Sequence, residues 1–174
     1  MTRTRVVEVE QLTELIAFPE ETVSAVMLPV TGEGIGSSAL ISSFQDSCRL
    51  AELITKQSKG SLTKFDDFAI SILKETANII GGAFLSEISN QTNISLIQSV
   101  PEPLFDTMKK VVGATIAKLH YKEGKLSVAF EIDFALSATT TTTTTTTTTE
   151  EILTHYIFLL EVGLAQKLFE ALKK

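Results

Sequence analysis

A carboxylate and a carboxamide stand three residues apart in the segment SILKETANIIGG, as Glu75 and Asn78. A carboxamide donates and accepts hydrogen bonds without carrying charge, while a carboxylate accepts hydrogen bonds and pairs with cations. Residues at this spacing share a face if the segment is helical. Gly81 and Gly82 follow directly, although glycine inside a helix costs about 1 kcal/mol relative to alanine. Their presence suggests that a packed element or a partner molecule approaches the helix backbone closely.

The hydrophobic periodicity around this segment predicts a helix over residues 64–90, with Thr63 as N-cap and Asp66 at the third helical position. At about 100° per residue, the apolar side chains of the helix form a stripe that we expect to face the core. Its members are Phe65, Phe68, Ile72, Thr76, Ile79, Ala83 and Phe84, widened by Ala69, Ile80 and Ile88.

A second stripe on the predicted helix consists of Ser71, Glu75, Asn78 and Gly82, at spacings of four, three and four residues. We expect this stripe to face solvent. Taken alone, polar residues on the outer face of a helix are usually only solvated, and glycines can serve helix packing alone. Periodicity therefore places these side chains together without assigning them a function.

The composition excludes several classes of function. The chain has 174 residues, of which 44% are hydrophobic and 21% charged, and this is typical of a globular domain. Its net charge of −6 provides no basic field for phosphate backbones, so we do not expect nucleic acid as a partner. No apolar run reaches the roughly 18–20 residues of a membrane span, and the start MTRTRVVEVE has no apolar signal core.

The familiar catalytic and metal-binding motifs do not occur. His120 and His155 are far apart, and the sequence has no HExxH, CxxC, EF-hand loop, Walker A or GxGxxG pattern. We therefore expect no metal site. The lone Cys48 cannot form an internal disulfide, which suits a cytoplasmic protein.

Alternating and helical patterns predict the remaining elements, with one low-complexity segment. The eleven threonines at 139–149 cannot distinguish an inner from an outer face, so we interpret them as an exposed, mobile hairpin tip of unspecified register. Strands are predicted at 6–9, 22–30, 37–44, 93–100, 125–137 and 151–160, and helices at 11–17, 46–57, 106–120 and 163–172 in addition to 64–90.

An internal repeat indicates the fold class. VSAVMLPV, a turn, SSALISSF and DSCRLAELI correspond to LSVAFEIDFAL, the threonine loop, EILTHYIFLL and GLAQKLFEAL. Each unit is a hairpin followed by a helix. Two such units predict a single α+β domain over residues 1–174, with pseudo-twofold symmetry, one mostly antiparallel sheet and long helices packed on a face.

The spacing around Glu75 and Asn78 resembles the signature of the CheC/CheX/FliY chemotaxis phosphatases. That signature is Asp or Ser, three residues, Glu, two residues, Asn, twenty-two residues and Pro. Ser71, Glu75, Asn78 and Pro101 fit all four positions. The similarity in the order of elements covers about residues 4–137 and 150–172.

Two features depart from the family pattern. Some members carry two such helices, whereas this sequence shows one. Either the protein has a single site, or this sequence is a shortened form. The threonine run is not a family feature.

The resemblance implies a phosphatase that removes the phosphoryl group from the aspartate of phosphorylated CheY, a receiver-domain response regulator. It implies that Asn78 orients the attacking water, that Glu75 pairs with the receiver's active-site lysine, and that Ser71 and Pro101 support the motif. Because the receiver supplies Mg²⁺, the chain would need no cofactor of its own.

A different class of function stays open beside the phosphatase. The chain would then be a non-catalytic binding or adaptor module for a receiver domain or for CheD, which some family members bind. The sequence does not show which receiver is the partner or whether the chain forms a homodimer.

Overall fold

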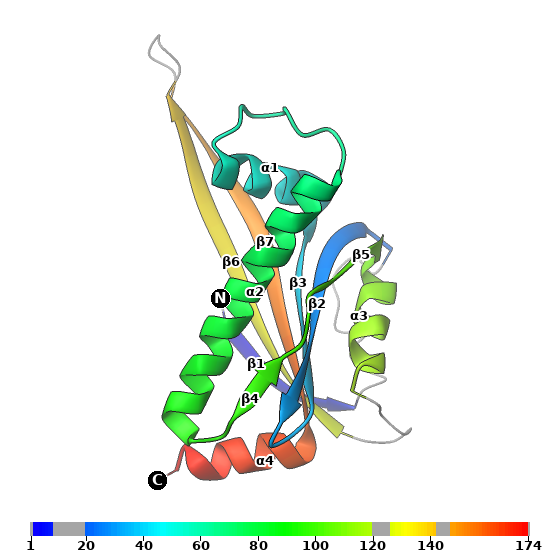
Figure 1. Ribbon diagram of the computed structural model, residues 1–174, viewed down its shortest axis with the longest axis vertical. Helices are drawn as coiled ribbons and strands as arrows, with labels where there is room; N and C mark the ends of the chain where they lie inside the picture. Colours follow the sequence, from blue (N-terminus) through cyan, green and yellow to red (C-terminus); the bar gives the residue numbers. More distant parts are fainter. Residues whose placement is uncertain (1, 9–19, 120–125, 142–146, 174) are drawn as a thin grey trace.

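One seven-stranded antiparallel sheet organises the described part of the chain (Figure 1). The computed structural model describes residues 2–8, 20–119, 126–141 and 147–173. In the order of the sheet, the strands are β1 (Thr2–Glu8), β6 (Leu126–Thr141), β7 (Thr147–Glu161), β3 (Gly36–Ser43) and β2 (Thr22–Gly32), with β4 (Leu96–Gln98) and β5 (Glu102–Thr107) both paired to β2.

The strand order confirms the predicted repeat. The β2–β3 hairpin leads into α1 (Phe44–Thr55), the β6–β7 hairpin leads into α4 (Val162–Ala171), and the hairpins meet where β3 pairs with β7. The strand before each hairpin pairs with the other unit, because β1 lies on β6 and β5 lies on β2. The sheet order is β1-β6-β7-β3-β2-β5. Read from the other end, it places β5, β2 and β3 where β1, β6 and β7 stood, as pseudo-twofold symmetry requires.

Helices cover both faces of the sheet, and the long predicted helix packs on one of them. The long helix α2 (Asp67–Thr92) crosses the front face in Figure 1, over a core that includes Leu28, Tyr156 and Phe158. On the opposite face, Val111 of α3 (Met108–Ala117) packs against the alternate residues of β2 and β3. The central strand β7 is apolar on both sides because it contributes to both cores.

The predicted core stripe of α2 was wrong in part. Phe65, Ile80, Phe84 and Ile88 pack against the core, but Phe68 and Ile79 are 51% and 62% exposed. The fully buried stripe repeats every fourth residue and consists mostly of small side chains, which let the helix lie close to the sheet. Its members are Ala69, Leu73, Ala77, Gly81 and Leu85.

Two further predicted elements differ from the structure. The helix predicted at 106–120 begins at Met108, because residues 102–107 form β5 instead. Pro103 fits this strand because β5 pairs with β2 along one edge only, and a missing N–H is tolerated at a sheet edge. On α1, Leu53 and Ile54 are exposed, whereas Glu52 is buried. The helical turns predicted at 11–17 lie outside the described residues.

The described threonines, at 139–141 and 147–149, form the paired ends of β6 and β7, as expected for the predicted hairpin. Both strands continue into the threonine run in one register, so that Thr139 pairs with Thr149 and Thr141 with Thr147. In Figure 1 this end of the hairpin extends beyond the rest of the sheet. The register is therefore continuous with the apolar part of the strands, and mobility of the tip stays a prediction.

α2 passes a simple test for a membrane span. Among the described residues it is the one helix of sufficient length and hydropathy, with a mean hydropathy of 1.3 over the tested window. Core helices of water-soluble domains pass the same test, and α2 lays its small-residue stripe on the sheet. The test is therefore weak evidence for a span.

The first turn of α2 is capped by Asp66 and not by Thr63 as predicted. The Asp66 carboxylate accepts a hydrogen bond from the Ala69 backbone N–H at 2.8 Å. We expect Asp66→Ala to lower the free energy of unfolding by about 1 kcal/mol, because the N–H loses its partner. Thr63→Ala is the matched control and is expected to change it little. Urea denaturation measures both, and the opposite ranking would restore Thr63 as the cap.

Candidate functional site

The outer face of α2 presents three of the predicted site residues in succession. Ser71 and Glu75 are exposed, and Asn78 is half-buried one turn further along. The Ser71 hydroxyl donates to the Phe68 carbonyl at 2.7 Å, which ties this side chain to its own helix. Glu75 has no ion-pair partner among the described residues. Its carboxylate is therefore available to an external cation.

Asn78 is held by Gln98 of β4, a residue that the sequence analysis did not identify. The Gln98 side-chain nitrogen Nε2 donates to the Asn78 backbone carbonyl at 2.9 Å and to its side-chain oxygen Oδ1 at 2.6 Å. Gln98 thus anchors the Asn78 backbone carbonyl and side-chain oxygen from the sheet side. The helix face that Asn78 shares with Glu75 points outward.

Gly81, the first residue of the glycine pair, makes room for this contact. A Cβ at position 81 would lie 2.5 Å from Gln98 Oε1 and 3.2 Å from Leu28 Cδ1, both too close. A Cβ at position 82 would lie 3.7 Å from Gln98 Nε2, an ordinary van der Waals distance. Close approach was predicted here for Gly81 and Gly82, and at Gly81 the approaching element is β4 of the same chain.

The chain path explains how residues so far apart in sequence meet. α2 ends at Thr92, and Asn93 reverses the chain in the left-handed conformation, with φ of 57°. β4 then runs back along β2, with Gln98 opposite Val30, and the Ser99 N–H donates to the Pro29 carbonyl at 2.7 Å. Pro101 follows, half-buried between β4 and β5. The twenty-two residues between Asn78 and Pro101 in the signature are therefore the rest of α2, the reversal at Asn93 and β4, which brings the chain back beside Asn78.

Two large apolar side chains flank Glu75 on the exposed side of α2. Phe68 and Ile79 stand on the same face as Ser71 and Glu75, at spacings of three and four residues. We call Phe68, Ser71, Glu75, Asn78 and Ile79 the α2 outer face. Apolar side chains grouped around a polar pair on a surface are typical of a protein-docking site.

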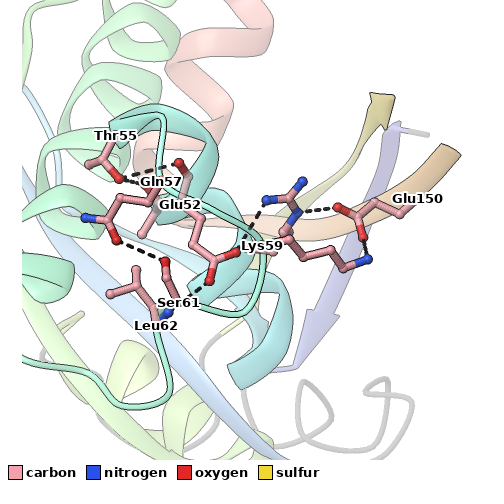
Figure 2. Close-up of polar contacts among 9 residues, drawn as sticks. Glu52, Thr55, Gln57, Lys59, Ser61, Leu62 and Glu150 are labelled. Carbon is pink, nitrogen blue, oxygen red and sulfur yellow. Dashed lines mark hydrogen bonds and ion pairs between the residues drawn. The ribbon is translucent and has the colours of Figure 1, made fainter. Parts of the chain in front are cut away.

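A second polar cluster joins α1, the loop that follows it and β7 (Figure 2). Its residues line part of a cavity of about 430 Å³. Arg49 binds both Glu52 and Glu150, and Lys59 also binds Glu150. Glu52 accepts from the Leu62 backbone N–H at 2.9 Å. These contacts connect the loop before α2 to β7.

The acidic groups of this cluster are already neutralised by their neighbours. Burial alone would raise the pKa of Glu52, but hydrogen bonds from the Leu62 and Gly60 backbone and from Arg49 outweigh it and hold the pKa below its ordinary value of 4.5. The cluster therefore has the character of a structural clamp. Among the described residues, no group of three or more His, Cys, Asp or Glu side chains is arranged to hold a metal ion.

Solved structures share this architecture at low sequence identity, although no family model matches the sequence. FliY of Thermotoga maritima has a TM-score of 0.68 at 13% identity, over 98% of this chain and 78% of that one. CheX of Desulfovibrio desulfuricans has a TM-score of 0.53 at 13% identity, over 92% and 83%. CheX of Borrelia burgdorferi, solved in a complex with CheY, BeF₃ and Mg²⁺, has a TM-score of 0.51 at 13% identity, over 87% and 89%. The chain therefore has the fold of the FliY and CheX chemotaxis proteins, as the signature predicted.

Proposed function

We propose that this protein is a cytoplasmic CheC-like phosphatase of chemotaxis signalling, which hydrolyses the phosphoaspartate of a CheY-type receiver domain. The observation that carries the proposal is the joint presentation of Glu75 and an anchored Asn78 on one exposed helix face. The fold shared with a CheX that was solved together with CheY supports a receiver domain as the partner.

The chemistry asked of the chain is small, because an acyl phosphate is already reactive. Asn78 orients a water whose oxygen attacks phosphorus in line with the bond to the aspartate oxygen. That bond breaks, the receiver's carboxylate leaves, and inorganic phosphate is released. An uncharged carboxamide can order this water beside an anion without repelling the phosphoryl group. Positioning of this kind lowers the activation free energy by several kcal/mol.

Glu75 provides the second contact, to the lysine of the receiver's active site. Charge pairing across an interface contributes more to specificity and register than to affinity. Phe68 and Ile79 would lose their exposure to water on docking, which stabilises the complex at about 25 cal/mol for each Å² of apolar surface buried. Ser71 and Pro101 support the motif, and the receiver supplies Mg²⁺.

Phosphate release from the phosphorylated cognate receiver, with Mg²⁺ present, tests the proposal. We expect the protein to accelerate release at catalytic, substoichiometric concentration. A stable complex without faster release would instead support the adaptor function, for the receiver or for CheD. If the protein neither bound the receiver nor accelerated phosphate release, both functions would be excluded for this receiver.

A further inference from the structure

We propose that Gln98 is a positioning residue that fixes the orientation of the Asn78 carboxamide for water attack. This inference rests on the proposed function, and it concerns a residue outside the four-position signature. Gln98 contacts Asn78 twice from a different element of the fold, β4.

The chemistry of the contacts fixes both amide orientations. The Asn78 backbone carbonyl can only accept, so the Gln98 atom that lies 2.9 Å from it is the donor Nε2. That same Nε2 lies 2.6 Å from the Asn78 side chain, whose nearest atom must then be the acceptor Oδ1. The Asn78 Nδ2 amide is thereby turned away from Gln98, and Oδ1 keeps a second lone pair. The two N–H donors of Nδ2 and one lone pair of Oδ1 stay available for phosphoryl oxygen and water.

Gln98 is itself held firmly in place. Its backbone is in register with Val30 of β2, and its side chain lies against the helix where Gly81 has no Cβ. Because both ends of the contact are fixed, the Asn78 carboxamide does not have to be ordered when the receiver docks. Pre-ordering of this kind is what a catalytic contact requires.

The inner end of the Gln98 amide, its oxygen Oε1, is unfavourable for stability. Among the described residues, Gln98 Oε1 is buried without a hydrogen-bond partner. A buried acceptor without a donor costs stability. This cost offsets the stability that the two hydrogen bonds from Nε2 contribute, so the orientation that Gln98 gives to Asn78 explains the glutamine better than stability does.

The test replaces the amide by a side chain of similar length and volume, in Gln98→Met. We expect kcat for phosphate release to fall about tenfold to a hundredfold, KM for the phosphorylated receiver to change less than twofold, and Tm to stay equal or rise. A merely structural glutamine would give the opposite pattern, a lower Tm with unchanged kcat, and that result would overturn the inference.

Two alanine substitutions give a matched comparison. Gly81→Ala places a Cβ 2.5 Å from Gln98 Oε1 and should push the amide away from Asn78, so kcat should fall as in Gln98→Met. Gly113→Ala makes the same change on α3, where the added Cβ meets no atom within 4 Å, and should keep wild-type kcat. Equal kcat for the two variants would contradict the inference.

A readout without the receiver separates this inference from the proposed function. The side-chain amide protons of Gln98 and Asn78 can be followed by NMR in the wild type, where we expect slow exchange for Gln98 Nε2. Gln98→Met should shift the Asn78 amide signals and speed their exchange. Unchanged Asn78 signals would refute the inference whether or not the wild type is active, whereas shifted signals in an inactive wild type would refute the phosphatase function alone.

Discussion

Asn78→Ala is expected to reduce the acceleration of phosphate release by about a hundredfold or more. The variant keeps the helix, because Asn78 is half-exposed and alanine is the best helix former. It removes the only group that we assign to the attacking water. Phosphate release at saturating phosphorylated receiver measures the effect.

The control for this substitution stands on the same helix. Asn90 is exposed near the end of α2, so Asn90→Ala makes the same chemical change away from the α2 outer face. It should leave the rate unchanged, and both variants should melt cooperatively. Full activity in Asn78→Ala would show that the proposed mechanism is wrong, even if the protein proved to be a phosphatase.

The largest effect on stability is expected for Phe158→Ala. Phe158 is completely buried on β7, and its ring meets that of Phe84 on α2 edge to face, with centroids 5.1 Å apart. Removing a buried phenylalanine ring costs about 3–5 kcal/mol, because transfer free energy is lost and a cavity is left behind. The free energy of unfolding from urea titration measures this loss.

Phe169→Ala is the matched control for the core substitution. Phe169 lies on α4 and is 43% exposed, so the same truncation should cost about 1 kcal/mol or less. If the two variants were equally stable, the assignment of the main core to the space between α2 and β7 would be wrong.

Local patterns predicted the hairpins because alternation and turn residues are read within a few positions. The inner stripe of α2 was misjudged for a physical reason. Ala77 and Gly81 face the sheet because small side chains allow close packing, whereas Phe68 and Ile79 are large and exposed. A hydrophobic pattern weighs side chains by size and polarity, so it turned the predicted core face toward the larger residues.

The site was predictable where one helix carries it and unpredictable where the fold assembles it. Helical periodicity alone placed Ser71, Glu75 and Asn78 together. The contact from Gln98 depends on the return of β4 along β2, which no local pattern encodes. The glycine pair was the available signal in the sequence. It indicated that another element or molecule packs closely against the helix, but it did not identify that element as β4.

The shortness of β4 has a consequence for how the site loses competence. β4 spans Leu96–Gln98, and its ladder with β2 covers Val30, Thr31 and Gly32, with one further bond from the Ser99 N–H to the Pro29 carbonyl. Edge segments with few pairings open locally at a smaller free energy than global unfolding requires. Fluctuations that detach β4 therefore release Asn78 while the rest of the sheet stays folded. Catalytic competence is therefore expected to follow the local equilibrium between attached and detached β4. A docked receiver would shift this equilibrium toward attached β4.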